Sequence, residues 1–171
     1  MRMTARKIAE KQGIRFQDSH YVIAHLGGGI SVGLVEGGYI TDINDALLGM
    51  GPFSPNRAGA LPIRGVVKLC QKMPEEEVCE LLARNSGLKV YLGTEDVREV
   101  LKMKKKGHRK AKLVYEAFIY QISKEIGAYF AASGCNAQAI ILTGGIAHNE
   151  TVTNDIKSYV GNLTDFYVYP G

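Results

Sequence analysis

The sequence has 171 residues, of which 46% are hydrophobic and 22% are charged, with a formal net charge of +4. This composition excludes a disordered chain, and the length suffices for one full domain but not for two large ones. Three cysteines are too few for a disulfide scaffold and favour a reducing compartment, while no apolar run approaches the ~20 residues of a membrane helix. Residues 1–12 also lack the apolar core of a signal peptide, so the sequence predicts a cytoplasmic protein without a membrane partner.

The N-terminal part of the chain predicts a helix followed by three strands. Residues 3–12 have an amphipathic pattern that ends at Gly13. Three short runs rich in β-forming residues follow, separated by glycine turns: 21–24, 30–35 and 39–43. Short strands joined by tight glycine turns are typical of an antiparallel meander.

Residues 44–62 predict a long irregular loop, because glycines and prolines interrupt any regular pattern there. Loops of this length in compact domains usually carry function or are disordered. The apolar residues Leu47, Phe53 and Leu61 are expected to anchor the loop, which favours an ordered one.

Helices are predicted in the middle of the chain. Pro62 can stand in the first turn of a helix that runs to about Gln71. Pro74 begins a second helix, which is expected to end at Gly87. Thr94 can cap a third helix that has acidic residues in its first turn.

The C-terminal part predicts a long helix and a strand–helix–strand unit. Residues 109–132 carry apolar side chains at four-residue spacing on one face: Val114, Phe118, Ile122 and Ile126. A strand over 139–143, a helix over about 150–160 and a strand over 166–169 follow, and this order makes the two strands parallel. The expected fold class is therefore α/β, a mixed sheet of about five strands with helices.

The first candidate site is the segment from His25 to Ser31, in which a strand leads into three successive glycines. Glycine lets backbone N–H groups approach an anion closely, so such a turn can hold phosphate oxygens. The same spacing also fits a plain glycine-rich hairpin turn beside a core histidine.

A second candidate lies where the predicted strand over 139–143 ends in Gly144 and Gly145, shortly before a helix. Ligands favour the carboxyl ends of sheet strands, and helix N-termini attract nucleotide groups. A tight strand-to-helix turn explains the same residues, and neither GxGxxG nor GxxxxGK[ST] is present.

Arg57 is a third candidate, between the prolines and glycines of the loop over 44–62. Its planar, permanently charged guanidinium is the group that a phosphoryl-transfer site uses to stabilise charge on the moving phosphate. A solvated loop arginine is the alternative interpretation.

Two other patterns carry less weight. The basic stretch over 102–112 could attract nucleic acid, but Gly107 interrupts it and no aromatic residue lies within its run of basic residues, so a solvated corner between helices is expected instead. Cys70 and Cys79 have no histidine near them, which gives metal binding little support.

Five segments, in order along nearly the whole chain, together resemble the butyrate kinase branch of the acetate and butyrate kinase family. They are His25–Ser31, Asp42–Ala46, Gly51–Gly59, Tyr91–Val100 and Leu142–His148. That family belongs to the actin-like, or ribonuclease H-like, superfamily of two-lobed phosphotransferases. The resemblance implies a carboxylate kinase that converts ATP and butanoate, a short-chain carboxylate, to ADP and butanoyl phosphate with Mg²⁺.

The resemblance also implies roles for individual residues. Arg57 falls where the family has an arginine that steadies the transferred phosphoryl group, and His25 where a histidine hydrogen-bonds that phosphate. The implied phosphate-binding residues are His25, Leu26, Gly27, Gly28, Gly29 and Ser31. The implied adenosine contacts are Asp96, Val97, Arg98, Gly144, Gly145, Ile146, Ala147, His148 and Asn149, and no residue is assigned to a metal.

The sequence also departs from the family pattern. The family's chains are much longer, and its N-terminal Asn-Pro-Gly-Ser-Thr-Ser type segment and its final helix have no counterpart here. We therefore expect residues 1–171 to be a single C-terminal, nucleotide-binding lobe that makes no acyl phosphate alone and that self-associates through an uncovered apolar face. Leu48 and Met50 stand where the family usually has two acidic residues. The alternative hypothesis is therefore an inactive fragment or paralogue that serves as a nucleotide-binding or assembly module.

Overall fold

The structure, a computed structural model, describes residues 1–170, and Gly171 lies outside the described residues. Contacts divide the chain into two compact units, which are described separately. The first comprises Met1–Gly27, Ser31–Asn44 and Ile119–Gly171, and the second comprises Gly28–Ile30 and Asp45–Phe118.

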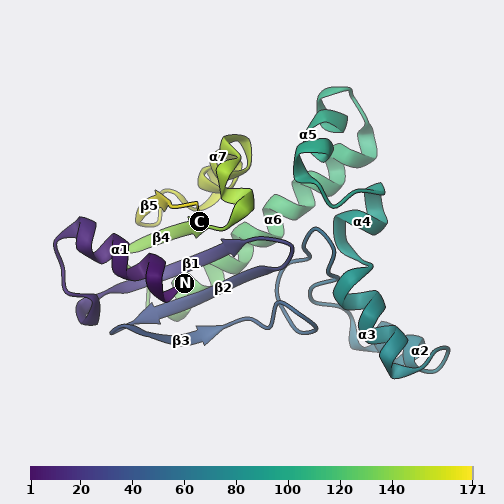
Figure 1. Cartoon of the computed structure of the whole chain (residues 1–171), viewed down its shortest axis with the longest axis horizontal. Helices are drawn as coiled ribbons and strands as arrows, with labels where there is room; N and C mark the ends of the chain where they lie inside the picture. Colours follow the sequence, from purple (N-terminus) through teal and green to yellow (C-terminus); the bar gives the residue numbers. More distant parts are fainter. Residues whose placement is uncertain (171) are drawn as a thin grey trace. The chain divides into compact units, whose positions relative to one another are not determined.

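The first unit is built on a mixed five-stranded sheet of order β3-β2-β1-β4-β5 (Figure 1). The strands are β1 (His20–Leu26), β2 (Ile30–Glu36), β3 (Tyr39–Ile43), β4 (Ala139–Thr143) and β5 (Asp165–Val168). β2 pairs with β3 in antiparallel fashion, whereas β4 is parallel to both β1 and β5. The predicted α/β class, the five strands and the parallel pair around the last helix are confirmed.

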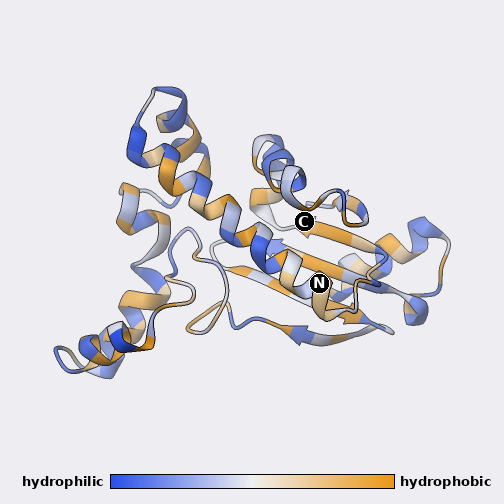
Figure 2. Ribbon diagram, turned by 180° about the vertical axis from the view of Figure 1, so that it is seen from behind, coloured by the Kyte–Doolittle hydropathy of each residue, from blue (hydrophilic) through white to orange (hydrophobic). Residues whose placement is uncertain are grey.

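Helices cover both faces of this sheet. They are α1 (Arg2–Gln12), the C-terminal part of α6 (Arg109–Ala132) and α7 (Glu150–Val160), with short 3₁₀ helices η1 (Phe16–Asp18) and η2 (Gly145–His148). The two opposite views show α1 on one face and α6 on the other (Figures 1 and 2). All of β4 is buried and the middle of β1 is buried, as expected for strands covered on both faces, and these central strands are hydrophobic in Figure 2.

The packing of α1 shows why its sequence forms this helix. Its apolar stripe, Ala5, Ile8 and Ala9, is buried in one cluster with Tyr21 and Ile23 of β1. The helix ends as predicted at Gly13, whose φ of 71° is left-handed and whose N–H donates to the Glu10 carbonyl at 3.2 Å.

The second unit contains helices and the irregular segment over 45–62. The helices are α2 (Ile63–Cys70), α3 (Glu75–Arg84), α4 (Gly87–Leu92), α5 (Val97–Lys105) and the N-terminal part of α6. Two predicted boundaries are wrong. α3 ends at Arg84, and Gly87 begins the unpredicted helix α4. Asp96, not Thr94, caps α5, because its carboxylate accepts the Arg98 N–H.

The segment over 44–62 has no regular structure, as predicted, but only one of its three expected anchors is buried. Phe53 is 6% exposed and contacts the rings of Tyr91 and Phe118, each with 5.8 Å between ring centroids. Leu47 and Leu61 are 52% and 41% exposed, so they do not anchor the loop in this structure.

The long helix is confirmed as predicted. Val114, Phe118, Ile122 and Ile126 are all buried along one face of α6. Of the helices described within residues 1–170, none combines the length and apolar character that crossing a membrane requires.

Candidate functional site

In the first unit, the glycine-rich turn begins at the end of β1. His25 is exposed there and lies in register with Thr143 of β4, while Leu26 is completely buried. Desolvation lowers the pKa of His25 from 6.5, and the positive Met1 amino group lowers it further. The imidazole is therefore predominantly neutral at pH 7 and offers one N–H donor.

Gly144 packs closely against the last residue of β1. Its φ is +92°, and a Cβ added at this position would lie 2.6 Å from the Leu26 carbonyl oxygen. Only glycine fits such a backbone approach. The end of β1 and the turn that follows β4 therefore lie side by side at the carboxyl edge of two parallel strands, where α/β sheets bind ligands.

The residues after Gly144 form η2 and lead into α7. Gly145 and His148 are exposed, Ile146 is half-buried and Ala147 is buried. The Asn149 side chain caps α7, since its Oδ1 accepts the N–H groups of Thr151 and Val152 in the first turn at 3.1 and 3.3 Å. Nearer the start of the sheet, Ser31 is half-buried in β2.

In the second unit, Arg57 packs directly against the glycine turn. A Cβ added at Gly29 would lie 2.2 Å from Arg57 Nη1 and 2.7 Å from its Cζ, whereas one added at Gly28 would meet only Asn56, at 3.8 Å. Arg57 Nη1 donates to the Ala46 carbonyl at 2.8 Å, and its Nε is buried with no hydrogen-bond partner among residues 1–170. A buried, unpaired guanidinium N–H is a donor available to an anion.

Backbone hydrogen bonds fix the loop that carries Arg57. The N–H groups of Ser86, Leu88 and Lys89 donate to the carbonyls of residues 56, 54 and 55 at 3.0, 3.1 and 2.9 Å. These donors lie at the start of α4, where a helix has no internal partners for its N–H groups. Gly87 is required between them, because a Cβ there would lie 1.9 Å from the Ser54 carbonyl oxygen.

Asp96, Val97 and Arg98 belong to the second unit, at the start of α5. Asp96 accepts the Arg98 N–H at 2.8 Å and pairs with the Arg98 guanidinium at 2.6 Å, while Val97 is buried. The side-chain hydrogen bond from Arg98, with its backbone hydrogen bond, lowers the pKa of Asp96 to about 2. A capping role accounts for these three residues within the chain, and a nucleotide contact remains an expectation.

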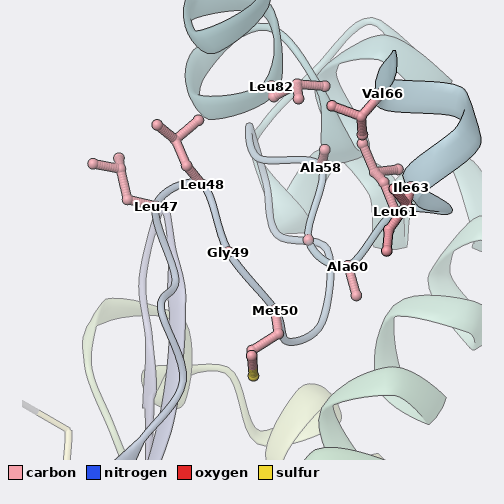
Figure 3. A pocket seen from close by; sticks show the side chains of 11 residues that line it. Leu47, Leu48, Gly49, Met50, Ala58, Ala60, Leu61, Ile63, Val66 and Leu82 are labelled. Atoms are coloured by element: carbon pink, nitrogen blue, oxygen red, sulfur yellow. The ribbon is translucent and has the colours of Figure 1, made fainter. Parts of the chain in front are cut away.

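Leu48 and Met50 line an open pocket of about 400 Å³ in the second unit (Figure 3). Ile63 and Val66 of α2 and Leu82 of α3 also contribute to its lining. All eleven lining residues are apolar or glycine: Leu47, Leu48, Gly49, Met50, Ala58, Gly59, Ala60, Leu61, Ile63, Val66 and Leu82. Leu48 and Met50 thus stand among apolar side chains and glycines.

Within residues 1–170, no group of three or more histidine, cysteine, aspartate or glutamate side chains could hold a metal ion. Cys70, Cys79 and Cys135 are all free thiols.

Comparisons with known proteins identify the family to which the chain belongs. The sequence model of the acetokinase family matches residues 2–163. The chain belongs to the acetokinase family. It is also 42% identical over 167 residues to the "probable butyrate kinase 2" of Caldanaerobacter subterraneus subsp. tengcongensis, a match that covers 96% of this chain and 47% of that protein. The chain thus spans about half the length of this family relative.

Solved structures of acetokinase family members show the same fold. The acetate kinase of Porphyromonas gingivalis aligns with 99% of this chain and 50% of its own, with a TM-score of 0.88 and 22% identity. A propionate kinase from Francisella tularensis subsp. tularensis aligns with 95% of this chain and 42% of its own, with a TM-score of 0.83 and 27% identity. The fold is therefore that of this kinase family, and its members are carboxylate kinases.

Sequence reasoning missed Ser54, whose hydroxyl contacts the glycine turn at the Gly28 carbonyl. Its position three residues before Arg57 is the one local signal that could have indicated it. The contact with Gly28, more than twenty residues away, depends on the folding of the loop and has no periodic pattern.

Proposed function

We propose that this chain supplies the ATP-binding part of a carboxylate kinase that converts ATP and butanoate to ADP and butanoyl phosphate. The observation that carries the proposal is the packing of the Arg57 guanidinium on the backbone of Gly29. A fixed cation beside the backbone amides of a glycine turn suits an anion such as the phosphate chain of ATP. Membership of the acetokinase family supports the same reaction class.

In the proposed reaction, a carboxylate oxygen attacks the γ-phosphorus and forms a new P–O bond. The bond from the γ-phosphorus to the β,γ-bridging oxygen breaks, and ADP leaves with that electron pair. No general base is needed, since a carboxylate is already ionised at neutral pH. Catalysis then depends on holding the phosphoryl group and balancing its negative charge.

Each unit contributes named groups to this proposal. In the second unit, Arg57 balances charge on the transferred phosphoryl group, and the amides of Gly28 and Gly29 bind phosphate oxygens. In the first unit, the neutral His25 ring donates to a phosphate oxygen. Gly144 to Asn149 contact the adenosine, as do Asp96, Val97 and Arg98 of the second unit.

Mg²⁺ accompanies ATP in this proposal and neutralises phosphate charge when bound. The described residues provide no cage of acidic ligands, and Leu48 and Met50 are apolar. Mg²⁺ commonly keeps several waters and binds chiefly through substrate phosphates. We therefore propose no protein ligand for Mg²⁺ in this chain.

The chain alone is expected to bind ATP without making acyl phosphate, because it matches only about half of its relative. We further propose a cytoplasmic location, in keeping with the free thiols, and self-association of the chain through exposed apolar surface.

Calorimetric titration of the chain with ATP and with AMP tests the proposal. Arg57→Ala should weaken ATP binding about tenfold, a loss of about 1.4 kcal/mol, and leave AMP binding unchanged. Arg64→Ala, which removes an exposed arginine of α2 in the same unit, is the matched control. A wild-type chain that binds no ATP refutes the proposal. Butanoate-dependent ADP release by the chain alone refutes the expectation that the isolated chain makes no acyl phosphate.

A second candidate function is a catalytically inactive nucleotide-binding or assembly module. The apolar side chains of Leu48 and Met50 in the pocket favour it, because the family usually has two acidic residues at these positions. Joining the chain to the N-terminal half of a family kinase decides between the two functions. Phosphorylation of butanoate at an ordinary enzymic rate by that chimera would exclude the inactive module.

A further inference from the structure

Ser54 is a buried serine whose hydroxyl has two partners in the second unit. It is 1% exposed. Its Oγ donates to the carbonyl oxygen of Gly28 at 2.5 Å and accepts the backbone N–H of Arg57 at 3.1 Å. One hydroxyl therefore joins the glycine turn to the loop that carries the arginine.

The bond to Gly28 determines which way the next amide points. The Gly28 carbonyl and the Gly29 N–H belong to one peptide plane, and a trans peptide directs these two groups to opposite sides. All peptide bonds among residues 1–170 are trans. With its carbonyl held by Ser54, this peptide presents the Gly29 N–H on the side away from Ser54.

The bond to Arg57 fixes the second group. Ser54 and Arg57 close a tight turn, in which the Ser54 N–H donates to the Arg57 carbonyl at 3.1 Å while the Ser54 Oγ accepts the Arg57 N–H. The backbone of Arg57 is therefore held from both sides, and its guanidinium extends to Gly29 and the Ala46 carbonyl.

We propose that Ser54 is a positioning residue for phosphate binding. Its hydroxyl orients the Gly29 N–H and, by holding the Arg57 backbone, also the Arg57 guanidinium, so that these two donors meet the same phosphate chain. This role rests on the proposed function, since it requires a nucleotide phosphate as the ligand. Ser54 itself makes no contact with the ligand.

The test separates the phosphate from the rest of the nucleotide. Dissociation constants for adenosine and ATP are measured by calorimetry for the wild-type chain, Ser54→Ala and Ser54→Thr. Loss of a serine with only a structural role would weaken the binding of both ligands alike, whereas loss of a positioning serine weakens the binding of ATP alone. Ser86→Ala is the matched control, because its hydroxyl also bonds a backbone carbonyl, that of Leu81 at 2.9 Å, without touching the glycine turn.

We expect Ser54→Ala to weaken ATP binding about tenfold, as loss of one organising hydrogen bond implies, with adenosine binding unchanged. Ser54→Thr, which keeps the hydroxyl, should recover most of the ATP affinity. Equal ATP affinity in the wild type and Ser54→Ala, or equal weakening of both ligands, overturns the positioning role alone. A wild-type chain that binds no ATP overturns the proposed function as well.

A measurement on the wild type covers the case in which Ser54→Ala does not fold. In ¹H–¹⁵N spectra, saturation with ATP should shift the Gly29 amide strongly, and adenosine should leave it in place. A Gly29 amide that ATP does not move overturns the inference.

Discussion

Replacing Gly29 with alanine should displace Arg57 without unfolding the chain. The added Cβ would lie 2.2 Å from Arg57 Nη1, and ordinary contact begins at 3.4 Å. The nitrogen must therefore move by about 1.2 Å, the difference between these two distances. Such a movement takes Nη1 from the position in which it donates to the Ala46 carbonyl at 2.8 Å.

The loss of stability should be small, because the displaced atoms are the far end of a flexible side chain. Loss of one hydrogen bond from a charged group costs about 1.5–3 kcal/mol, and alanine returns about 0.4–1 kcal/mol by restricting the unfolded chain. Gly29 has no positive φ, so alanine adopts its backbone conformation without strain. The expected net loss is about 0.5–2.6 kcal/mol. A 1 Å misplacement at a site, in contrast, can cost up to about a hundredfold in function.

The assay compares ATP and AMP binding by calorimetry with urea unfolding of the same variants. Gly29→Ala should weaken ATP binding at least about tenfold with AMP binding unchanged. Gly28→Ala is the control for stability, since its Cβ meets only Asn56 at 3.8 Å. Wild-type ATP affinity in Gly29→Ala would refute the reasoning, as would a stability loss well above that of one hydrogen bond.

Three further predictions concern stability and pH. Gly144→Ala should lower the free energy of urea unfolding by about 2–4 kcal/mol, because its Cβ meets fixed backbone at 2.6 Å and its φ is +92°. Gly145→Ala should be nearly neutral, so equal effects of the two substitutions would contradict this prediction. The pKa of His25, measured by NMR, should lie below 6.5. The unfolded chain then binds more protons than the folded chain, so stability falls as the pH drops from 6.5 through the lowered pKa. A titration midpoint at or above 6.5 would disprove this prediction. Asp96, with a pKa of about 2, should stabilise the chain above pH 3.8 and lose this effect as the pH falls toward 2. In thermal unfolding, Asp96→Asn should keep the cap of α5 and Asp96→Ala should lose it, so equal midpoints would exclude a capping role.

Local patterns were sufficient to predict most of the secondary structure. Gly13 ends α1 as its sequence indicates, and the four-residue spacing over 114–126 marks the buried face of α6. These signals succeed because capping and periodic burial involve residues close together in the chain.

The errors arise where distant segments decide the outcome. Gly87 has the sequence signature of a helix end, yet the Ser54 carbonyl requires glycine there and α4 begins at this point. Leu47 and Leu61 are apolar residues of the kind expected to anchor a loop in the core, but they line an open pocket. The contact between Arg57 and Gly29 could not be predicted from local patterns either, because the two residues lie in different loops, separated in the chain by β2 and β3.

The loop between β3 and α2 has a consequence for how length variation is tolerated. Surface loops without regular structure usually accept insertions at small cost. This loop closes on itself through the Ala60 N–H and the Gly51 carbonyl at 2.9 Å, and α4 holds it from outside. A residue added between Gly51 and Arg57 would shift Arg57 by one position relative to these bonds, so the loop could not keep all of them. We therefore expect this segment to tolerate insertions as poorly as a helix or strand does, although it contains neither.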